Sequence, residues 1–539
     1  MKMNDRSRSL CYFALPVLLL AACVFRPSLA SAQMTSMGVD CGQINVSSLM
    51  MQDNLRAGRI LIECGIAQGG QPATASATHK APAPPNIRVS SAPGCNSTGD
   101  LCGSESMVAV STADKGQTIV VNYNANGSFN GGEYLATSYS TDGGATFTEI
   151  YPTGSGHGES VSDPIVVYNS KLGEFFGGDL VTGCGGQGIG LWSSKDGKNW
   201  KTGACAHSGP FDDRESMWAD NEPTSGTYGR MYISWNDYAT SCGAGGCLFV
   251  TYSDNGTSWS TPLQVGGNSS LFLRDVQITG SPRGAKLVGK NSTVFIASMD
   301  EGGGGNATRQ NFMFRSTDGG KTWAQVTMGP RYNPVGDASC ASNSYFYQVN
   351  PIIRHMGWGQ PAVGPDGVVH YVYAGAGTNG DHGDIFYQRS TNNGKTWSKA
   401  IKLNTDKDAP NKTQWMPSLS ATSDGMVTAS WYDRRKATSV CTSVGDPGCN
   451  YERVGRQSKT NGASWLADVT ISTKLITQPA QDDGGVVGCY AGDYDYNVAL
   501  NAADAGNGTG SAYITWTDGR KKISGVPVQN VDFAMTPEP

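Results

Sequence analysis

The sequence has few charged residues and lacks the motifs of the common hydrolase classes. Only 16% of its 539 positions are Asp, Glu, Lys or Arg, and neither an H-E-x-x-H nor a G-x-S-x-G string occurs. These absences argue against zinc proteases and against α/β-hydrolases built on a nucleophile elbow. The apolar share of 38% is nevertheless too high for a disordered chain. A folded protein of another class is therefore expected.

Beyond residue 32 the sequence has no apolar run near the roughly 18 residues that a membrane helix needs. The first 32 residues combine basic positions, an apolar run over 11–25 and the small-residue pattern Ala30-x-Ala32. This pattern predicts a secretory signal peptide that is cleaved after Ala32. Leu20-Ala-Ala-Cys23 also resembles a bacterial lipobox. We therefore expect a secreted or periplasmic protein or, alternatively, a lipoprotein anchored through Cys23.

Charge and histidine usage exclude further classes. The whole chain has 40 basic and 45 acidic residues, and removal of four basic residues and one acid with the signal leaves a net charge of −8. That balance argues against nucleic acid as a partner. The six histidines do not cluster and no C-x-x-C occurs, so we expect neither a metal nor another cofactor.

Twelve cysteines remain after the signal, an even number that fits an oxidising compartment. Ten of them are close neighbours in sequence, and the other two are Cys340 and Cys489. Six disulfides are expected, with a connectivity that the sequence does not prove. The neighbouring pairs are Cys41/Cys64, Cys95/Cys102, Cys184/Cys205, Cys242/Cys247 and Cys441/Cys449.

Glycine is abundant, with 71 residues, and much of it lies in one turn motif that occurs six times. The clearest copies are Ser140-Thr-Asp-Gly-Gly-Ala-Thr-Phe147 and Ser316-Thr-Asp-Gly-Gly-Lys-Thr-Trp323. Ser and Asp side chains can bind turn amides, Gly can adopt a positive φ, and the ring can pack against the next unit. The weaker copies end at Trp200, Trp259, Trp397 and Trp465.

A β-rich run that mostly ends in a polar residue occurs seven times. Together with its neighbours it gives units of four strands, which is typical of a β-propeller. We predict an all-β fold of four-stranded blades, seven rather than six, because residues 491–537 lack an outer strand that Asn86–Ser91 would supply. The seven runs are Val120–Asn124, Phe175–Asp179, Tyr232–Asp237, Val294–Asp300, His370–Tyr373, Thr428–Asp433 and Tyr513–Asp518.

These features divide the chain into three parts. Residues 1–32 are the signal, and residues 33–85 are a short segment with one helix around Ser48–Ile62 followed by a Pro/Ala-rich linker. Residues 86–539 are the propeller. In such an array the repeated turns share one face, so ligand-binding loops are expected on the opposite face.

The repeated turns are those of the Asp-box (BNR) repeat, and residues 86–537 resemble the bacterial sialidase-like family of secreted propellers. The resemblance implies a glycosidase acting on an acidic or terminal sugar. It also implies three arginines that hold a carboxylate, a tyrosine nucleophile with a glutamate base, and an aspartic acid/base. The family's Arg-Ile-Pro signature is absent, and the nearest string is Ile87-Arg88-Val89.

Candidate site residues are those that interrupt the repeated pattern. Asp213, Glu215 and Tyr494 are the catalytic candidates, while Arg214 is a substrate-binding candidate that begins the third unit. Arg274 and Arg354 occupy similar positions. The other substrate-binding candidates are Arg434, Arg435 and Arg520, which follow a repeated Asp in only two units.

Two functions follow from these features. The first is an exported, monomeric, sialidase-like glycoside hydrolase acting on a carbohydrate or glycoconjugate. The second is a non-catalytic propeller that binds glycan or protein at the cell surface, with the arginines as braces paired to aspartates. Convergence of three arginines beside a tyrosine and a glutamate would favour the enzyme.

Overall fold

A computed structural model gives the fold of most of the chain. It describes residues 33–71, 86–90, 103–125, 134–151, 156–242, 245–267, 270–350, 353–443, 446–481 and 483–537. The predicted signal peptide, the lipobox Cys23, the pair Cys95/Cys102 and most of the predicted linker lie outside these residues. No helix in the described part is long and apolar enough to cross a membrane.

The described chain is almost entirely β-strand, and most strands form seven antiparallel sheets of four strands. The predicted all-β class is confirmed. In chain order, the first three sheets consist of β2 (Ser104–Val110), β3 (Ile119–Asn124), β4 (Leu135–Ser140) and β5 (Thr148–Ile150); of β6 (Ser160–Asn169), β7 (Glu174–Val181), β8 (Gly188–Ser194) and β9 (Lys201–His207); and of β10 (Asp212–Ala219), β11 (Met231–Cys242), β12 (Gly245–Ser253) and β13 (Leu263–Gly266). The next three sheets consist of β14 (Leu273–Gly280), β15 (Val294–Asp300), β16 (Gln310–Ser316) and β17 (Ala324–Thr327); of β21 (Gln360–Val363), β22 (Val369–Gly375), β23 (Asp384–Ser390) and β24 (Ile401–Lys402); and of β25 (Gln414–Ala421), β26 (Val427–Asp433), β27 (Glu452–Ser458) and β28 (Val469–Thr470).

The seventh sheet joins the two ends of the array. It contains β29 (Asn497–Leu500), β30 (Ser511–Asp518), β33 (Asn530–Pro537) and, as its outer strand, β1 (Ile87–Arg88). Ile87 lies opposite Phe533 and Arg88 opposite Asp532, and the side chains of Arg88 and Asp532 form an ion pair. The expected contribution of the N-terminal strand to the last sheet is confirmed.

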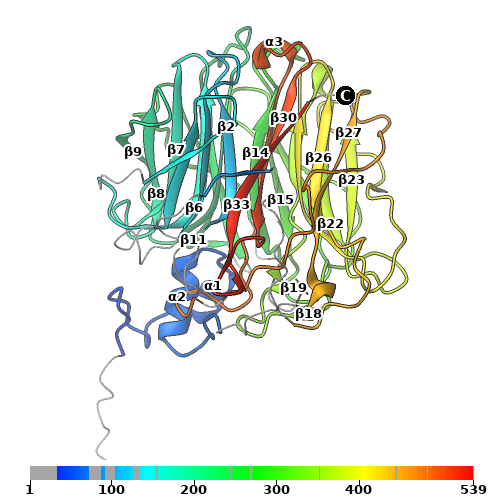
Figure 1. The fold of residues 1–539 in the computed structure, drawn as a ribbon. Coiled ribbons are helices and arrows are strands. Elements are labelled where there is room, and N and C mark those ends of the chain that lie inside the picture. Colours follow the sequence, from blue (N-terminus) through cyan, green and yellow to red (C-terminus); the bar gives the residue numbers. More distant parts are fainter. Residues whose placement is uncertain are drawn as a thin grey trace, which may run out of the picture.

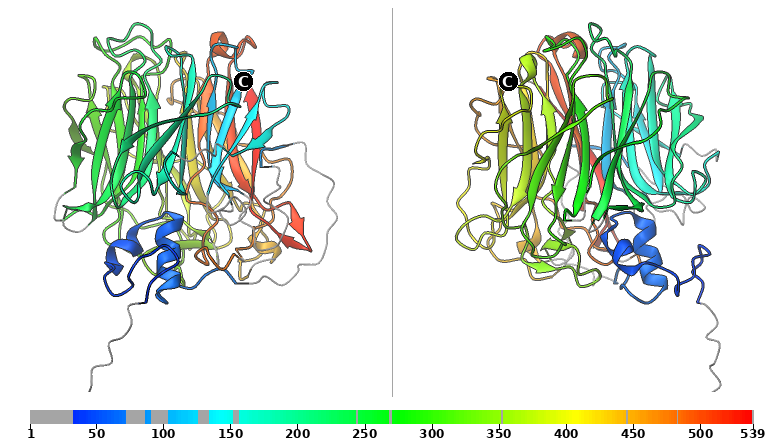
Figure 2. Two further views of the ribbon diagram at one scale, coloured as in Figure 1. Left: turned by 90° about the vertical axis from the view of Figure 1, so that its left-hand side faces the viewer. Right: turned by 180° about the vertical axis from the view of Figure 1, so that it is seen from behind.

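The sheets form a closed cycle of contacts. The first strand of each sheet contacts the first strand of the next, from β2 through β6, β10, β14, β21 and β25 to β29, which returns to β2. Figures 1 and 2 show the sheets standing side by side around a common centre, as the blades of a β-propeller do. Apolar side chains fill the layers between neighbouring sheets, for example Phe176 of β7 with Met217 of β10.

The six repeated turns share one hydrogen-bond pattern. In each, the hydroxyl of the first Ser accepts a bond from an amide of the turn, as Ser140 does from Gly144 at 2.9 Å. The rings at the ends of the turns pack between sheets: Phe147 contacts Phe533, and Trp465 contacts Tyr387 of the preceding sheet. These local interactions explain why the motif recurs once in each of six units.

Two smaller sheets and three helices complete the structure. One small sheet contains β18 (Ala338–Ser339), β19 (Tyr347–Asn350) and β20 (Ile353–Arg354), and the other contains β31 (Lys522–Ile523) and β32 (Val526–Pro527). In Figure 1, α1 (Val46–Met51) and α2 (Leu55–Glu63) lie at the same end of the molecule as β18 and β19, whereas α3 (Ala502–Ala505) lies at the opposite end. Single-turn 3-10 helices occur at Pro365–Gly367 and Pro447–Cys449.

The N-terminal segment contains two helices, where the sequence predicted one around Ser48–Ile62. The chain becomes extended at Gln52, with ψ of 141°, and restarts when the Asn54 side chain accepts a hydrogen bond from the amide of Ala57. An N-cap of this kind begins a new helix rather than continuing the first. The interruption leaves Asp53 at the joint between α1 and α2.

Five disulfides are present among the described residues. They join Cys41 to Cys64 and Cys340 to Cys489, and they also pair the three other neighbouring sets of cysteines in the described chain. The prediction is confirmed for these ten cysteines. The Cys340–Cys489 bond spans 149 positions and ties the loop before β21 to the loop before β29.

Candidate functional site

The innermost strands of five sheets carry the same backbone irregularity close to their starts. In each, the pairing register shifts and a non-glycine residue has a φ between 48° and 68°, and in β6 the preceding Ser162 has a positive φ of 126° as well. Such β-bulges redirect a side chain, and a positive φ costs a non-glycine residue about 1 kcal/mol or more. The five residues are Glu105 at 53°, Asp163 at 68°, Arg214 at 57°, Asp275 at 57° and Met416 at 48°, and all are buried.

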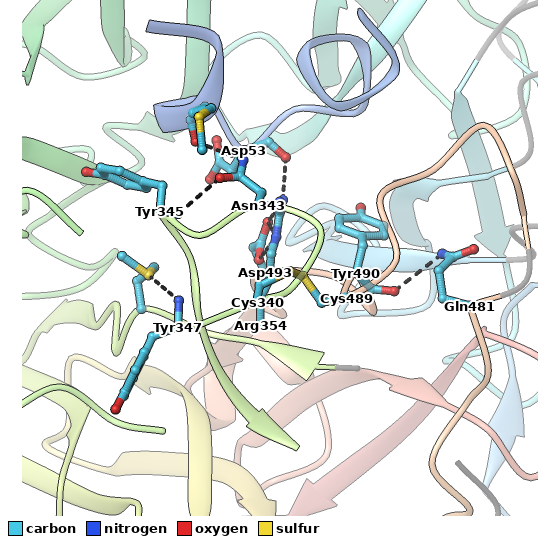
Figure 3. The surroundings of a disulfide bond; sticks show 12 residues. Asp53, Cys340, Asn343, Tyr345, Tyr347, Arg354, Gln481, Cys489, Tyr490 and Asp493 are labelled. Atoms are coloured by element: carbon cyan, nitrogen blue, oxygen red, sulfur yellow. Dashed lines mark hydrogen bonds and ion pairs between the residues drawn. A yellow bond between two sulfur atoms is a disulfide. The ribbon is translucent and has the colours of Figure 1, made fainter. Parts of the chain in front are cut away.

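Three arginines from different strands contact one residue, Asp53, at the centre. Arg274 of β14 lies 3.1 Å from Asp53 Oδ1, and the Nε of Arg214 lies 3.6 Å from Oδ2. Arg354 of β20 donates a 2.7 Å hydrogen bond to the backbone carbonyl of Asp53 and binds Asp493 through Nε at 2.9 Å. Figure 3 shows Arg354 reaching toward Asp53, with Asp493 beside it. All three guanidinium groups are buried.

Aromatic rings hold the arginines from the sides. The Arg214 guanidinium lies 3.8 Å from the centre of the Tyr494 ring, and that of Arg354 lies 3.9 Å from the centre of the Phe346 ring. Trp358 faces both Arg214 and Arg274 at 5.3 Å. Desolvated cation–π contacts of this kind each contribute about 2 kcal/mol. The arginines are therefore fixed in place by rings as well as by carboxylates.

Acidic residues outnumber the arginines at this centre, and burial and neighbouring charges shift the pKa values of these acids. Burial, followed by repulsion from neighbouring carboxylates, raises the pKa of Asp213 and of Glu215 well above the usual range. Burial and Asp53 raise the pKa of Asp163 to about 7. Burial would also raise the pKa of Asp53, but attraction to Arg274 and Arg214 outweighs it and lowers that pKa. The site therefore favours the protonated forms of Asp213, Glu215 and Asp163 and the ionised form of Asp53.

Two catalytic candidates lack hydrogen-bond partners. The hydroxyl of Tyr494 and both carboxyl oxygens of Glu215 are buried and make no hydrogen bond. Buried polar groups are normally satisfied, so such atoms mark a place where a ligand or water can bind. Tyr496, stacked on Tyr494 at 5.0 Å, binds Arg214 through its hydroxyl at 2.9 Å.

A channel of about 230 Å³ is lined by the inner strands and by Tyr496, whose hydroxyl binds Arg214 of this cluster. Its walls are mainly apolar side chains such as Val166, Met217 and Leu419, and its lining includes Tyr496 and Gln277. Gln277 donates a short hydrogen bond to the hydroxyl of Tyr496, the residue that binds Arg214. Tyr496 therefore connects the polar cluster with the mainly apolar channel.

Two groups of acids lie close enough together to hold a cation. One comprises Asp53, Asp163 and Asp213, and the other Asp381, Asp384 and Asp408. A basic side chain contacts each group: Arg274 lies near Asp53 and Asp213, and Lys402 lies near Asp384 and Asp408. Each group therefore has one basic side chain that offsets part of its negative charge.

The structure brings some of the predicted site residues together and places others elsewhere. Asp213, Arg214, Glu215 and Tyr494 all lie at the centre. Arg435 instead pairs with Asp433 and Asp468, Arg520 pairs with Asp518 and Asp532, and Arg434 donates to the carbonyl of Gly448 in its own loop. The contacts of Arg435 and Arg520 are those of the bracing alternative.

The sequence analysis did not identify the acids at the bulges, nor Asp53 of the N-terminal segment. Glu105, Asp163 and Asp275 stand next to the start of an innermost strand, in the same place as Arg214. Their common position was visible as a polar residue that precedes each apolar run. No comparable signal indicated Asp53, because it reaches the centre from outside the repeats.

Comparisons with known proteins identify no family. No protein-family description matches the chain, and no curated protein is similar in sequence. Among solved structures, an α-L-arabinofuranosidase from Fusarium graminearum is 12% identical with a TM-score of 0.38, over 84% of this chain and 97% of that one. The leech intramolecular trans-sialidase is 11% identical with a TM-score of 0.39, over 86% and 71%. The intramolecular trans-sialidase of Ruminococcus gnavus is 12% identical with a TM-score of 0.39, over 82% and 96%.

Proposed function

We propose that this chain is an exported glycosidase, a propeller of seven blades that acts on a sugar bearing a carboxylate. The observation that carries the proposal is the convergence of three arginines on Asp53, with Arg214 and Arg274 facing its carboxylate and Arg354 binding its backbone carbonyl. Arginine suits this task because its planar fork meets a carboxylate with paired hydrogen bonds. The resemblance of the repeated turns to the sialidase-like family points to the same ligand class.

The neighbouring residues supply groups suited to glycoside cleavage. Tyr494 is the proposed nucleophile, because a neutral phenol avoids repulsion from an anionic sugar. Asp213 and Asp163 are the proposed acids, since raised pKa values keep their protons available at neutral pH. Glu215 is a further proposed acid/base group, because burial favours its protonated form and its two oxygens have no hydrogen bond that would hold them away from a substrate.

The remaining parts of the proposal concern location and organisation. The disulfides support an oxidising compartment, in agreement with the predicted signal over 1–32 and the alternative lipid anchor at Cys23. Residues 33–85 are the proposed N-terminal segment with its linker, and residues 86–539 are the proposed propeller. We expect a monomer without a cofactor.

A non-catalytic carbohydrate-binding propeller is the second candidate. It is favoured by the Tyr494 hydroxyl, which makes no hydrogen bond to a glutamate that would act as its base. In that case the same three arginines would bind an acidic sugar without cleaving it. The two candidates share a ligand class and differ only in turnover.

The test uses two forms of the mature chain, the natural one and one with residues 33–71 deleted. The deletion removes Asp53, which contacts the three arginines assigned to the ligand. Both are incubated with aryl sialosides, aryl glucuronides and neutral aryl glycosides after circular dichroism has confirmed folding. Cleavage of acidic over neutral glycosides supports the enzyme, and binding without cleavage supports the second candidate. Equal treatment of acidic and neutral sugars by both forms would refute the proposal.

A further inference from the structure

The residues between α1 and α2 are polar and yet fully buried. Gln52, Asp53 and Asn54 are only 2–3% exposed. A joint between two short surface helices normally faces water, and polar side chains there are seldom buried. Here the joint is inserted among the inner strands of the sheets. We call residues 33–71 the N-terminal plug.

Asp53 offers the centre both a carboxylate and a peptide group, and both are bound. Arg274 and Arg214 face its carboxylate, and Arg354 binds its carbonyl. Its amide donates to Asp213 at 3.2 Å, and the next side chain, Asn54, donates to the same carboxyl at 2.7 Å. The plug thus occupies the arginines that the proposed function assigns to the ligand.

Apolar contacts seat the helices on the loops around the centre. Met50 and Met51 pack against a cluster that contains Phe346 and Trp358. On α2, Leu55 packs with Val487, and a Cβ at Gly58 would lie 3.0 Å from the Val487 side chain. A larger residue than glycine would therefore press α2 away from this loop.

The electrostatic fit at Asp53 is incomplete. Neither carboxyl oxygen of Asp53 makes a hydrogen bond, and no nitrogen of Arg274 makes one either. The pair attracts by charge at 3.1 Å without the paired hydrogen bonds that an arginine forms best with a carboxylate. A ligand that forms those bonds would hold the arginines more strongly than the plug does.

The covalent structure allows the plug to leave as a unit. Its only two cysteines, Cys41 and Cys64, are bonded to each other. No disulfide therefore joins the plug to the sheets, and the main chain from residue 72 onward is its only covalent link to them. Asn45 and Asn54 cap its two helices from within the segment.

We propose that the N-terminal plug is an intramolecular inhibitor in which Asp53 takes the place of an acidic ligand, its carboxylate facing Arg214 and Arg274 and its carbonyl bound by Arg354. This inference rests on the proposed function, because it assigns the same arginines to an acidic ligand. The site is closed while the plug is seated. Cleavage of the chain after the plug, or competition by an acidic ligand, opens it.

The experiment detects plug release without relying on ligand binding. A specific protease recognition sequence is placed within residues 72–85 of the full mature chain. The folded protein is then treated with phenylglyoxal, which modifies accessible arginines, before and after cleavage. Peptide mass spectrometry compares Arg274 and Arg354 with Arg435, whose side chain is 20% exposed and serves as an internal reference. Calorimetry with N-acetylneuraminic acid and with glucuronic acid measures binding by the same samples.

Cleavage is expected to raise modification of Arg274 and Arg354 about tenfold or more, because the open fraction limits the apparent reactivity. Modification of Arg435 should stay unchanged. Asp53→Asn removes the charge that attracts the arginines and should raise modification further in the cleaved chain. Asp40→Asn, the same substitution elsewhere in the plug, is the matched control and should have no such effect.

Each outcome decides one of the two proposals. Higher modification together with binding of an acidic sugar supports both. Higher modification without binding of either sugar supports the plug and refutes the acidic-sugar function. Unchanged modification in the cleaved natural chain and in cleaved Asp53→Asn would overturn the plug. So would an intact chain that binds the sugars as tightly as the cleaved one.

Discussion

Arg274 should be the residue whose loss most weakens the centre of the molecule. Its guanidinium lies 3.1, 3.8 and 3.9 Å from the carboxylates of Asp53, Asp213 and Glu301 and is fully buried. Arg274→Met keeps a long apolar side chain and removes the charge. Removing one partner of a buried ion pair typically costs about 3–5 kcal/mol, because the remaining charge stays desolvated.

The loss can be expressed as a change in melting temperature. At about 2.1 cal/mol/K per residue, the 539-residue chain has an entropy of unfolding near 1 kcal/mol/K. The expected loss then lowers Tm by about 3–5 °C. Arg230→Met is the matched control, because Arg230 pairs with the exposed Asp254 at the surface. Such pairs contribute about 1 kcal/mol or less, so the control should shift Tm by about 1 °C or less.

The pH dependence gives the sharper criterion. Without Arg274 the pKa of Asp213 rises further above its unfolded value, and the pKa of Asp53 loses the attraction that lowers it. A raised folded pKa means that stability is kept at low pH and lost as the pH rises through that pKa. The deficit of Arg274→Met relative to the natural chain should therefore be larger at pH 8 than at pH 5.5 in differential scanning calorimetry. A deficit equal at both pH values, or equal to that of Arg230→Met, would refute the reasoning.

Three further outcomes are expected. Glu215→Gln mimics the protonated acid that burial favours, so it should leave Tm unchanged near pH 4 and raise Tm at pH 8. The same variant should abolish glycoside cleavage. A lower Tm at pH 8 would contradict this reasoning. Arg520→Ala removes the ion pairs of Arg520 with two aspartates, so it should lower the free energy of unfolding in urea by about 1–3 kcal/mol and leave sugar affinity intact. Lost affinity with full stability would instead support its predicted role in binding. Replacing Cys340 and Cys489 together by Ala should lower the free energy of unfolding by about 4–5 kcal/mol, since their bond closes a loop of 149 positions. An unchanged unfolding midpoint would show that the two loops stay together without the disulfide.

Most of the fold was predictable because its signals are local. A turn such as Ser140–Phe147 contains its own hydrogen-bond donors and acceptors, and its ring fixes the spacing to the next sheet. Counting strands then showed that the last unit lacked one, which Ile87 and Arg88 supply. The two helices of the N-terminal segment were less predictable, because their separation depends on Asn54 acting as a cap.

The centre was only partly predictable because it depends on long-range contacts. Arg214 and Glu215 stood out as breaks in the repeats, but their direction is set by a bulge that no residue pattern specifies. The hydrogen bond from the Asp53 amide to Asp213 joins positions 160 apart. Arg520 also breaks the repeated pattern, and it pairs with two aspartates of its own sheet, Asp518 and Asp532.

The repeated bulge has a consequence for how this architecture can acquire new chemistry. Five innermost strands present one residue each at an equivalent backbone position, and the side chains found there are as different as Glu105, Arg214 and Met416. The conformation is thus set by the strand and tolerates an acid, a base or a thioether. A single substitution at such a position exchanges one buried functional group for another without a change of scaffold. The propeller thus provides five equivalent positions whose side chains can be changed one at a time, by evolution or by design. Among these five residues, Met416 is the one without an ionisable group.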